Sequence, residues 1–311
     1  MTVPAPLPGR RLGYRLLGPG FDYILHLRPA EWPIMTAHTL IGYVLAVGWT
    51  GLWRGEALGP LLLGLFAWVV LLNGGTLAIN SAFDRDEGDI GYLRAPPPAP
   101  KHLALVAFLL MAAGQGLAQL LPPLFRLAYA ACFVLSILYS VPPARLKAVA
   151  GLDWIINMWG FGTLTPLAGL ALTGMVPSTV LWIVLLAFCP LFAALYPLTQ
   201  LYQYEEDRRR GDHTLALVLG MRLSLQVALG GVVLAFGLFS LAAYLSAWGP
   251  GSPALFRWGA LAVALTAWLR VLIPWLRDYP MRSPADHQRG MYEALGAWAV
   301  TDIAVLAAWH W

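Results

Sequence analysis

Residues 60–82 read PLLLGLFAWVVLLNGGTLAINSA and contain no charged side chain. About 20 mostly apolar residues are enough for one helix to cross the hydrocarbon core of a bilayer. Eight further stretches of similar character occur in the chain, so the sequence predicts an all-α integral membrane protein with a bundle of nine helices. The nine expected spans are approximately 32–53, 60–82, 102–121, 124–141, 152–172, 178–200, 223–247, 254–276 and 290–309.

The composition extends this prediction to the whole chain. Of the 311 residues, 59% are hydrophobic and 12% are charged, and the mean hydropathy is +0.65. A soluble domain carries about twice that share of charged residues. No polar linker divides the chain, so residues 1–311 are predicted to form a single membrane domain.

The basic residues predict how the bundle is oriented. With nine spans, the N-terminus and the loops after the even-numbered spans share one side, and 16 of the 20 Lys and Arg residues fall there. Basic residues collect in cytoplasmic loops, so this side is expected to be cytoplasmic, in the inner membrane if the cell is bacterial. The formal charge of +4 reflects this basic face. It suits anionic lipid head groups and anionic substrates, and it does not imply a nucleic acid partner.

Half of the 16 acidic residues are concentrated in two short segments on the same side. Carboxylates packed so closely repel one another unless a cation neutralises them. Two solvated polar turns are the simpler interpretation, but two such loops on one face, each beside arginine, favour a metal–anion site. The acidic residues are Asp84, Asp86, Glu87 and Asp89 in the first loop and Glu205, Glu206, Asp207 and Asp212 in the second.

The end of the second expected span carries polar side chains on one helical face. Asn80 and Asp84 are four residues apart, and Asn73 lies about two turns earlier on that face. Oxygen ligands without a nearby His or Cys cluster favour Mg²⁺ or Ca²⁺ over zinc. Mg²⁺ commonly shares its coordination with a substrate phosphate. Cytoplasmic basic residues that can hold such a phosphate are Arg94, Lys101, Arg145 and Lys147.

Three motifs follow one another along the chain: Asn80-Ser-Ala-Phe-Asp84-Arg-Asp86-Glu-Gly-Asp89, then Tyr139-Ser-Val-Pro-Pro-Ala-Arg145-Leu-Lys147, then Gln203-Tyr-Glu-Glu-Asp207-Arg-Arg-Arg-Gly211. In this order they resemble the UbiA family of membrane prenyltransferases, and the resemblance covers nearly the whole chain. Two positions depart from the family pattern. Asp89 sits one residue late, and Gln203 replaces an aspartate, which leaves the number of bound Mg²⁺ ions open. The first loop, which keeps more of the pattern, is expected to be the more sensitive to mutation.

The resemblance implies Mg²⁺-dependent transfer of an isoprenyl group from its diphosphate to a lipophilic acceptor in the membrane, on a UbiA-type nine-helix bundle. It implies catalytic roles for Asn80, Asp84 and Asp207. The expected Mg²⁺ ligands are Asp84, Asp86, Asp89, Glu206 and Asp207, and the expected diphosphate-binding residues are Arg94, Arg145 and Lys147. Expected residues of the prenyl and cation pocket are Phe83, Tyr139 and Tyr196, and those near the acceptor are Asp153 and Asn157.

Two alternatives remain open on the sequence alone. A terpene cyclase of the same fold would ionise the same diphosphate without an acceptor. A membrane transporter or scaffold would use the acidic turns without Mg²⁺ chemistry. The sequence indicates no protein partner, acceptor or prenyl chain length, and it suggests no role for Asp302, deep in the last expected span.

Overall fold

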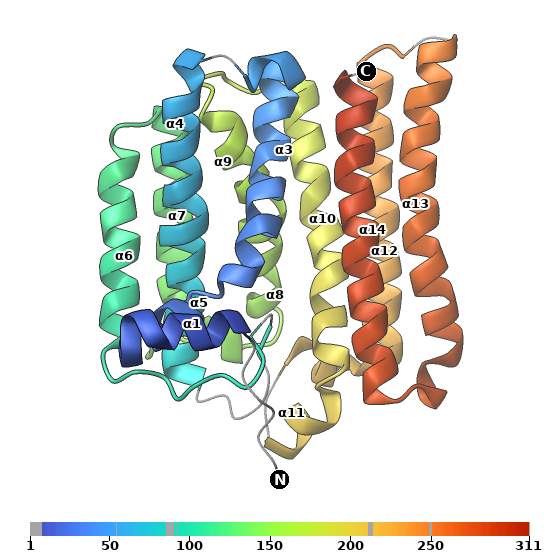
Figure 1. Cartoon of the computed structure of the whole chain (residues 1–311). Helices are drawn as coiled ribbons and strands as arrows, with labels where there is room; N and C mark the ends of the chain where they lie inside the picture. The colour runs from blue at the N-terminus through green and yellow to red at the C-terminus, as the bar shows by residue number, and fades with distance from the viewer. Residues whose placement is uncertain are drawn as a thin grey trace.

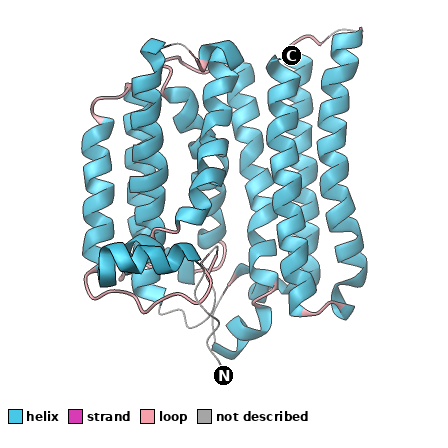
Figure 2. Cartoon of the chain, in the orientation of Figure 1, coloured by secondary structure: helices cyan, strands magenta, loops and turns pink. Residues whose placement is uncertain are grey.

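The computed structural model describes residues 8–53, 55–84, 90–91, 93–210, 214–248 and 251–310. Within these ranges, the side chains of Pro8, Glu56, Ala57, Glu206, Arg210 and Ser252 are not described. The described residues form helices and connecting loops, and their only bridge of extended backbone joins Ile90 to Leu93 (Figure 2). The predicted all-α fold is confirmed.

The longer helical elements follow one another in a simple order along the chain (Figure 1). They are α1 (Pro8–Leu17), α2 (Phe21–His26), α3 (Trp32–Gly51), α4 (Gly55–Leu65), η3 (Phe66–Asn73), α5 (Gly74–Asp84), α6 (Leu103–Ala118), α7 (Pro123–Ser140), α8 (Leu152–Asn157), η5 (Met158–Leu164), α9 (Thr165–Ala171), α10 (Thr179–Leu201), α11 (Tyr204–Arg210), α12 (Leu215–Leu245), α13 (Ser252–Asp278) and α14 (Pro284–His310). Short 3₁₀ turns are η1 (Gly18–Gly20), η2 (Pro29–Glu31), η4 (Leu146–Ala148) and η6 (Tyr279–Met281).

Seven helices in the described part of the chain are long and apolar enough to cross a membrane. They are Pro29–Gly51, Leu58–Asp84, Pro123–Ser140, Thr179–Leu201, Leu215–Leu245, Pro253–Met281 and Pro284–His310. The remaining two expected spans correspond to the shorter apolar helix α6 and to the run α8–η5–α9. The protein is an integral membrane protein. Helix α12 is interrupted at Gly220, whose φ of 76° is not helical, so its longer part begins just after this residue, close to the expected span 223–247. A short helical segment from Leu215 precedes it, where the Thr214 hydroxyl accepts a bond from the Leu217 N–H and caps the helix.

Helix α3 lies between two groups of helices and contributes to the core of both. Met35 and Tyr43 pack with residues of α4, η3, α6, α7 and α9. Ile41 and Val44 pack with residues of α10, α12, α13 and α14. A side chain at Gly42 would overlap the Pro166 carbonyl of α9, so the glycine allows α3 and α9 to pack backbone against backbone.

Two spans contain a π-helical segment instead of a continuous α-helix. These segments are η3, between α4 and α5, and η5, between α8 and α9. A π-helix bonds to the residue five positions away, and such turns are frequent at functional sites. Both segments contribute residues to the pocket described below.

Three short helices were not predicted from the sequence: α1, α2 and α11. Helix α1 crosses the end of the bundle at which α5 ends, and it lies across the direction of the long helices (Figure 1). The Arg10 guanidinium donates to the carbonyls of Arg94 and Ala95, at 3.2 and 2.9 Å. His26 Nε2 lies 3.1 Å from the Pro97 carbonyl, and burial lowers the pKa of this histidine. The N-terminal helices therefore hold the proline-rich loop against the bundle.

Candidate active site

A cluster of opposite charges forms where α5 ends. The Lys147 ammonium donates to Asn80 Oδ1 at 2.8 Å and contacts Asp84 Oδ1. The Arg145 guanidinium lies 3.7 Å from the same carboxylate oxygen. Ser140 adds a 3.4 Å bond to Asn80 Oδ1. Residues that the sequence assigned to two separate motifs therefore meet at one place.

The loop after α7 brings the two cations back to α5. Helix α7 ends at Ser140 because Pro142 and Pro143 follow, and proline cannot supply the N–H that a continued helix requires. Arg145 adopts a left-handed backbone conformation, with φ of 33°. The short turn η4 then follows and carries Lys147.

The oxygen atoms of this cluster already hold a cation, because the Lys147 ammonium is bound by an amide oxygen and a carboxylate oxygen. These are the hard donors that Mg²⁺ prefers. The donor set of Asn80 and Asp84 therefore fits a divalent cation that would exchange places with the lysine. Asp86 and Asp89, expected as further ligands, lie outside the described residues.

The second acidic loop forms the short helix α11. Asp207 is buried and its N–H donates to the Gln203 carbonyl at 2.8 Å, whereas Glu205 is exposed. The side chain of Glu206 is not among those described. Across the described ranges, three or more His, Cys, Asp or Glu side chains do not gather into a metal-binding group. The arrangement that would join Asp84 to Asp207 therefore stays a prediction.

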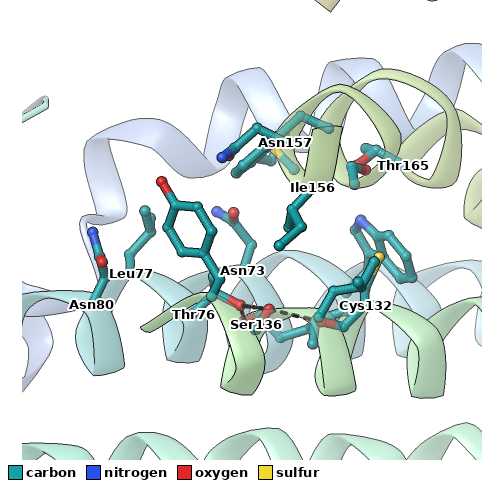
Figure 3. A pocket seen from close by; sticks show the side chains of 16 residues that line it. Asn73, Thr76, Leu77, Asn80, Cys132, Ser136, Ile156, Asn157 and Thr165 are labelled. Carbon is teal, nitrogen blue, oxygen red and sulfur yellow. Dashed lines mark hydrogen bonds between the residues drawn. The ribbon is translucent and has the colours of Figure 1, made fainter. Parts of the chain in front are cut away.

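A pocket of about 140 Å³ opens beside the charge cluster and shares Asn80 with it. Its walls come from α3, η3, α5, α7, α8, η5 and α9, and Figure 3 shows Asn73 and Asn157 on opposite sides of it. The lining residues are Met35, Trp68, Leu72, Asn73, Thr76, Leu77, Asn80, Cys132, Leu135, Ser136, Tyr139, Ile156, Asn157, Gly160, Phe161 and Thr165. The charged end of α5 thus lies at the edge of a mostly apolar chamber.

The residues expected around the prenyl group fall into different environments. Tyr139 lines the pocket, and its hydroxyl lies 3.3 Å from that of Tyr196, which stands behind it. Phe83 packs on the small cluster of Ala78, Ile79 and Leu103 and is not among the lining residues.

Of the two residues expected near the acceptor, one lines the pocket and the other does not. Asn157 lines the pocket, whereas the fully buried Asp153 is turned toward α10. Asp153 Oδ2 accepts from the Tyr196 hydroxyl at 3.0 Å and from the Gln200 amide at 3.4 Å. Its Oδ1 accepts from the Gly151 N–H at 2.8 Å. Asp153 therefore supports the wall of the pocket through Tyr196 instead of facing the cavity.

Asp302 contacts a histidine, and the sequence did not suggest this interaction. His38 Nδ1 of α3 lies 3.5 Å from Asp302 Oδ1 of α14. The rings of Phe188 and Trp298 enclose the histidine edge to face, at centroid distances of 5.1 and 5.0 Å. A polar residue in each of the first and last spans could have signalled such a pair, but no spacing links them.

The arrangement defines a class: an all-α integral membrane protein with a cation-holding polar cluster at the edge of an apolar pocket. Residues 35–286 match the UbiA prenyltransferase family, and the chain belongs to this family. The resemblance seen in the motifs is thereby confirmed.

Solved structures share the fold at low sequence identity. A UbiA homologue from Archaeoglobus fulgidus bound to DMAPP and Mg²⁺ has a TM-score of 0.60 and 18% identity, over 91% of this chain and 99% of that one. The same homologue bound to GPP and Mg²⁺ has a TM-score of 0.61 and 18% identity, over 90% and 99%. A digeranylgeranylglyceryl phosphate synthase has a TM-score of 0.67 and 16% identity, over 93% and 97%. A comparison with curated proteins found no match.

Proposed function

We propose that this protein transfers an isoprenyl group from an isoprenyl diphosphate to a lipophilic acceptor within the membrane. The observation that carries the proposal is that Asn80 belongs both to the charge cluster with Asp84 and Lys147 and to the lining of the apolar pocket. A diphosphate needs the first environment and an isoprenyl chain needs the second. Family membership and the fold shared with homologues bound to DMAPP or GPP support this assignment.

The reaction breaks the bond between the allylic carbon and the diphosphate oxygen, and the electron pair leaves with the diphosphate. A bond forms between that carbon and the acceptor, whose displaced proton departs with the diphosphate. Fixed positive charge placed where negative charge develops lowers the barrier to such a step. Lys147 and Arg145 are placed to supply it, and Arg94 is exposed on the loop held by Arg10.

Mg²⁺ would be held by Asp84, Asp86, Asp89, Glu206 and Asp207, with Asn80 beside them, and it would neutralise charge on the leaving diphosphate. Lys147, which contacts Asp84 and Asn80, would bind a phosphate oxygen of the substrate once Asp84 held Mg²⁺.

The pocket protects the allylic cation from water. Tyr139 presents a ring to the cavity, and Trp68 and Phe161 supply further aromatic faces, which attract cations. Tyr196 holds the Tyr139 hydroxyl from behind, so it acts on the pocket through its neighbour.

We propose that the N-terminus and both acidic loops are cytoplasmic, because 16 of the 20 basic residues fall on that side of the expected spans. The water-soluble diphosphate would reach the site from the cytoplasm, and the acceptor would reach it from the lipid.

The test is purified protein in detergent with Mg²⁺, a set of isoprenyl diphosphates and a membrane lipid extract, analysed by mass spectrometry. We expect an isoprenylated lipid and inorganic diphosphate, and no turnover after chelation with EDTA. Hydrocarbon formed from the diphosphate alone would identify a cyclase. No consumption of any diphosphate would favour a transporter or scaffold and overturn the proposal.

A further inference from the structure

Asp153, at the start of α8, is a carboxylate only 1% exposed. Its Oδ2 accepts from the Tyr196 hydroxyl at 3.0 Å and from the Gln200 amide at 3.4 Å, and its Oδ1 accepts from the Gly151 N–H at 2.8 Å. These partners are neutral, and the ion pairs seen among the described residues do not include Asp153. A buried carboxylate without a cation is costly in a membrane protein, so such a group is a candidate for function.

Gln200, near the end of α10, uses both ends of its side-chain amide. Its Nε2 donates to Asp153, and its Oε1 accepts from the Ala216 N–H at 3.0 Å. Ala216 lies in the first turn of α12, where the backbone N–H groups have no partner within the helix. The chain between Gln200 and Ala216 includes α11 with the buried Asp207. Gln200 therefore joins the two ends of the second acidic segment.

The loop that carries Lys147 is tied to the same carboxylate. Gly151 lies four residues after Lys147 and directly precedes α8. Its φ of 93° is a conformation that favours glycine, and it directs the N–H to Asp153. Asp153 thus fixes the point at which this loop enters the bundle.

The third connection leads to the wall of the pocket. The Tyr196 hydroxyl, which donates to Asp153, lies 3.3 Å from the hydroxyl of Tyr139. Through Asp153, Tyr196 and Gln200, one hydrogen-bonded network joins the pocket wall, the loop of Lys147 and the second acidic segment.

These three parts must keep a common geometry if they act on one substrate. Lys147 follows α7, whereas Asp207 lies in α11, between α10 and α12. A shift of about 1 Å in a group that positions a substrate can cost roughly 100-fold in rate. A buried connection between the loop and the segment limits such a shift.

We propose that Asp153 and Gln200 are positioning residues, which hold the second acidic segment and the loop of Lys147 in register so that both act on the same diphosphate. The inference rests on the proposed function and adds two residues to it. In this role neither side chain contacts the substrate, so their loss weakens the hold on the diphosphate without removing a reacting group.

Gln200→Met tests the connection directly. The variant keeps the length of the side chain and removes both hydrogen bonds of the amide. The dissociation constant of GPP is measured by calorimetry on the full chain in detergent, with Mg²⁺ and without acceptor. We expect it to rise about 10-fold, the effect of losing about one hydrogen bond that holds the site. In steady-state kinetics, KM for GPP should rise by a similar factor, with kcat within about 3-fold of wild type.

The matched control is Thr199→Val, at the adjacent position of α10. The Thr199 hydroxyl donates to the Tyr196 carbonyl of its own helix at 2.7 Å, so the control loses a hydrogen bond outside the network. Its binding of GPP should equal that of the wild type. The melting temperature of each variant shows whether it is folded.

Asp153→Asn tests the other end of the connection and does not depend on the folding of Gln200→Met. It keeps the size of the side chain and replaces an acceptor oxygen by an amide nitrogen. We expect a similar rise in KM, and the double variant should be no worse than the more affected single variant, because both changes break one network. Effects on KM that multiply in the double variant would contradict a shared role.

Failure of the inference differs from failure of the proposed function. If the wild-type protein neither binds nor consumes any isoprenyl diphosphate, the proposed function is wrong. If the wild type is active, and folded Gln200→Met and Asp153→Asn bind GPP as it does, only the positioning role is wrong. A lower melting temperature with unchanged KM would likewise overturn that role and leave a structural one.

Discussion

Lys147–Asp84 and His38–Asp302 are two pairs of ionisable side chains, and burial does not distinguish them. The side chains of the first pair are 10% and 19% exposed, and those of the second are 6% and 12% exposed. Their surroundings differ. Asp84 faces two cations and shares its lysine with Asn80 at the edge of a pocket. His38 and Asp302 face each other among aromatic rings of the core.

The two pairs differ in whether the aspartate can exchange its partner for another cation. Asp84 is also approached by Arg145, and Lys147 also donates to Asn80. We therefore expect Asp84 to accept another cation in place of Lys147. Among the described residues, Asp302 faces one charged or titratable side chain, His38, so this interaction fits a role in holding α3 to α14. We therefore expect substitutions at the first pair to change activity and substitutions at the second pair to change stability.

The largest expected effect comes from Asp84→Asn. The amide keeps the size of the side chain but removes the charge that holds the cation, and we expect diphosphate consumption to fall at least about 100-fold. Consumption is measured at saturating Mg²⁺, and the melting temperature in detergent is measured on the same sample. Asp302→Asn is the matched control, expected to stay within a few-fold of wild-type activity. An Asp84→Asn protein that keeps a tenth of the wild-type activity would contradict the assignment of the Lys147–Asp84 pair to catalysis.

Lys147→Met should have the next largest effect. Loss of a charge-assisted hydrogen bond to the substrate corresponds to about a 10- to 100-fold decrease in kcat/KM for the isoprenyl diphosphate. Arg145→Met should cost less, because the arginine is 47% exposed and lies 3.7 Å from Asp84. Steady-state kinetics of the two variants compares them directly. If both variants lost the same factor in kcat/KM, the greater exposure of Arg145 would not make it less important than Lys147.

The second pair is tested by stability. Asp302→Leu removes the carboxylate beside His38 Nδ1, while His38 Nε2 keeps its 3.4 Å contact with the Gly162 carbonyl. We expect this loss to cost roughly 1–3 kcal/mol. The double variant His38→Leu with Asp302→Leu replaces both partners by apolar groups and should recover most of that loss. Thermal unfolding in detergent measures both, and diphosphate consumption at a permissive temperature should be unchanged. A double variant no more stable than the single one would contradict a paired role.

The smallest expected effect is that of Arg10→Ala. This change removes two hydrogen bonds to the carbonyls of Arg94 and Ala95, so the loop that carries Arg94 becomes less well positioned. We expect KM for the diphosphate to rise about 2- to 10-fold, with kcat retained. Arg11→Ala, at the exposed neighbour, serves as the control. An identical effect of both changes would point to the total charge of α1 instead.

Hydropathy was sufficient to predict the spans, because each crossing of the bilayer needs a long apolar run. Helices α1 and α11 were missed, since short polar helices leave no such signal. The spacing of Asn80 and Asp84 predicted their shared helical face. Lys147 was expected to bind the diphosphate; the structure places its ammonium against Asn80 and Asp84, and the diphosphate role stays a prediction.

The interior of the pocket could not be predicted in the same way. Asn73, Asn157 and the Thr76–Ser136 bond come together only through the packing of η3, α5, α7 and α8. His38 and Asp302 lie near opposite ends of the chain, and their contact depends on α3 packing beside α14. Local sequence patterns do not contain this information.

The π-helical segment η3 has a consequence for insertions and deletions. A deletion of one residue within Phe66–Asn73 would restore an ordinary α-helix and leave the span long enough for a membrane. A π turn holds about one residue more than an α turn, so the two ends of the span would keep nearly the same orientation about its axis. The change would instead fall within the segment, which contributes Trp68, Leu72 and Asn73 to the pocket. The extra residue in this span therefore shapes the wall of the pocket, while the span is as able to cross the bilayer without it.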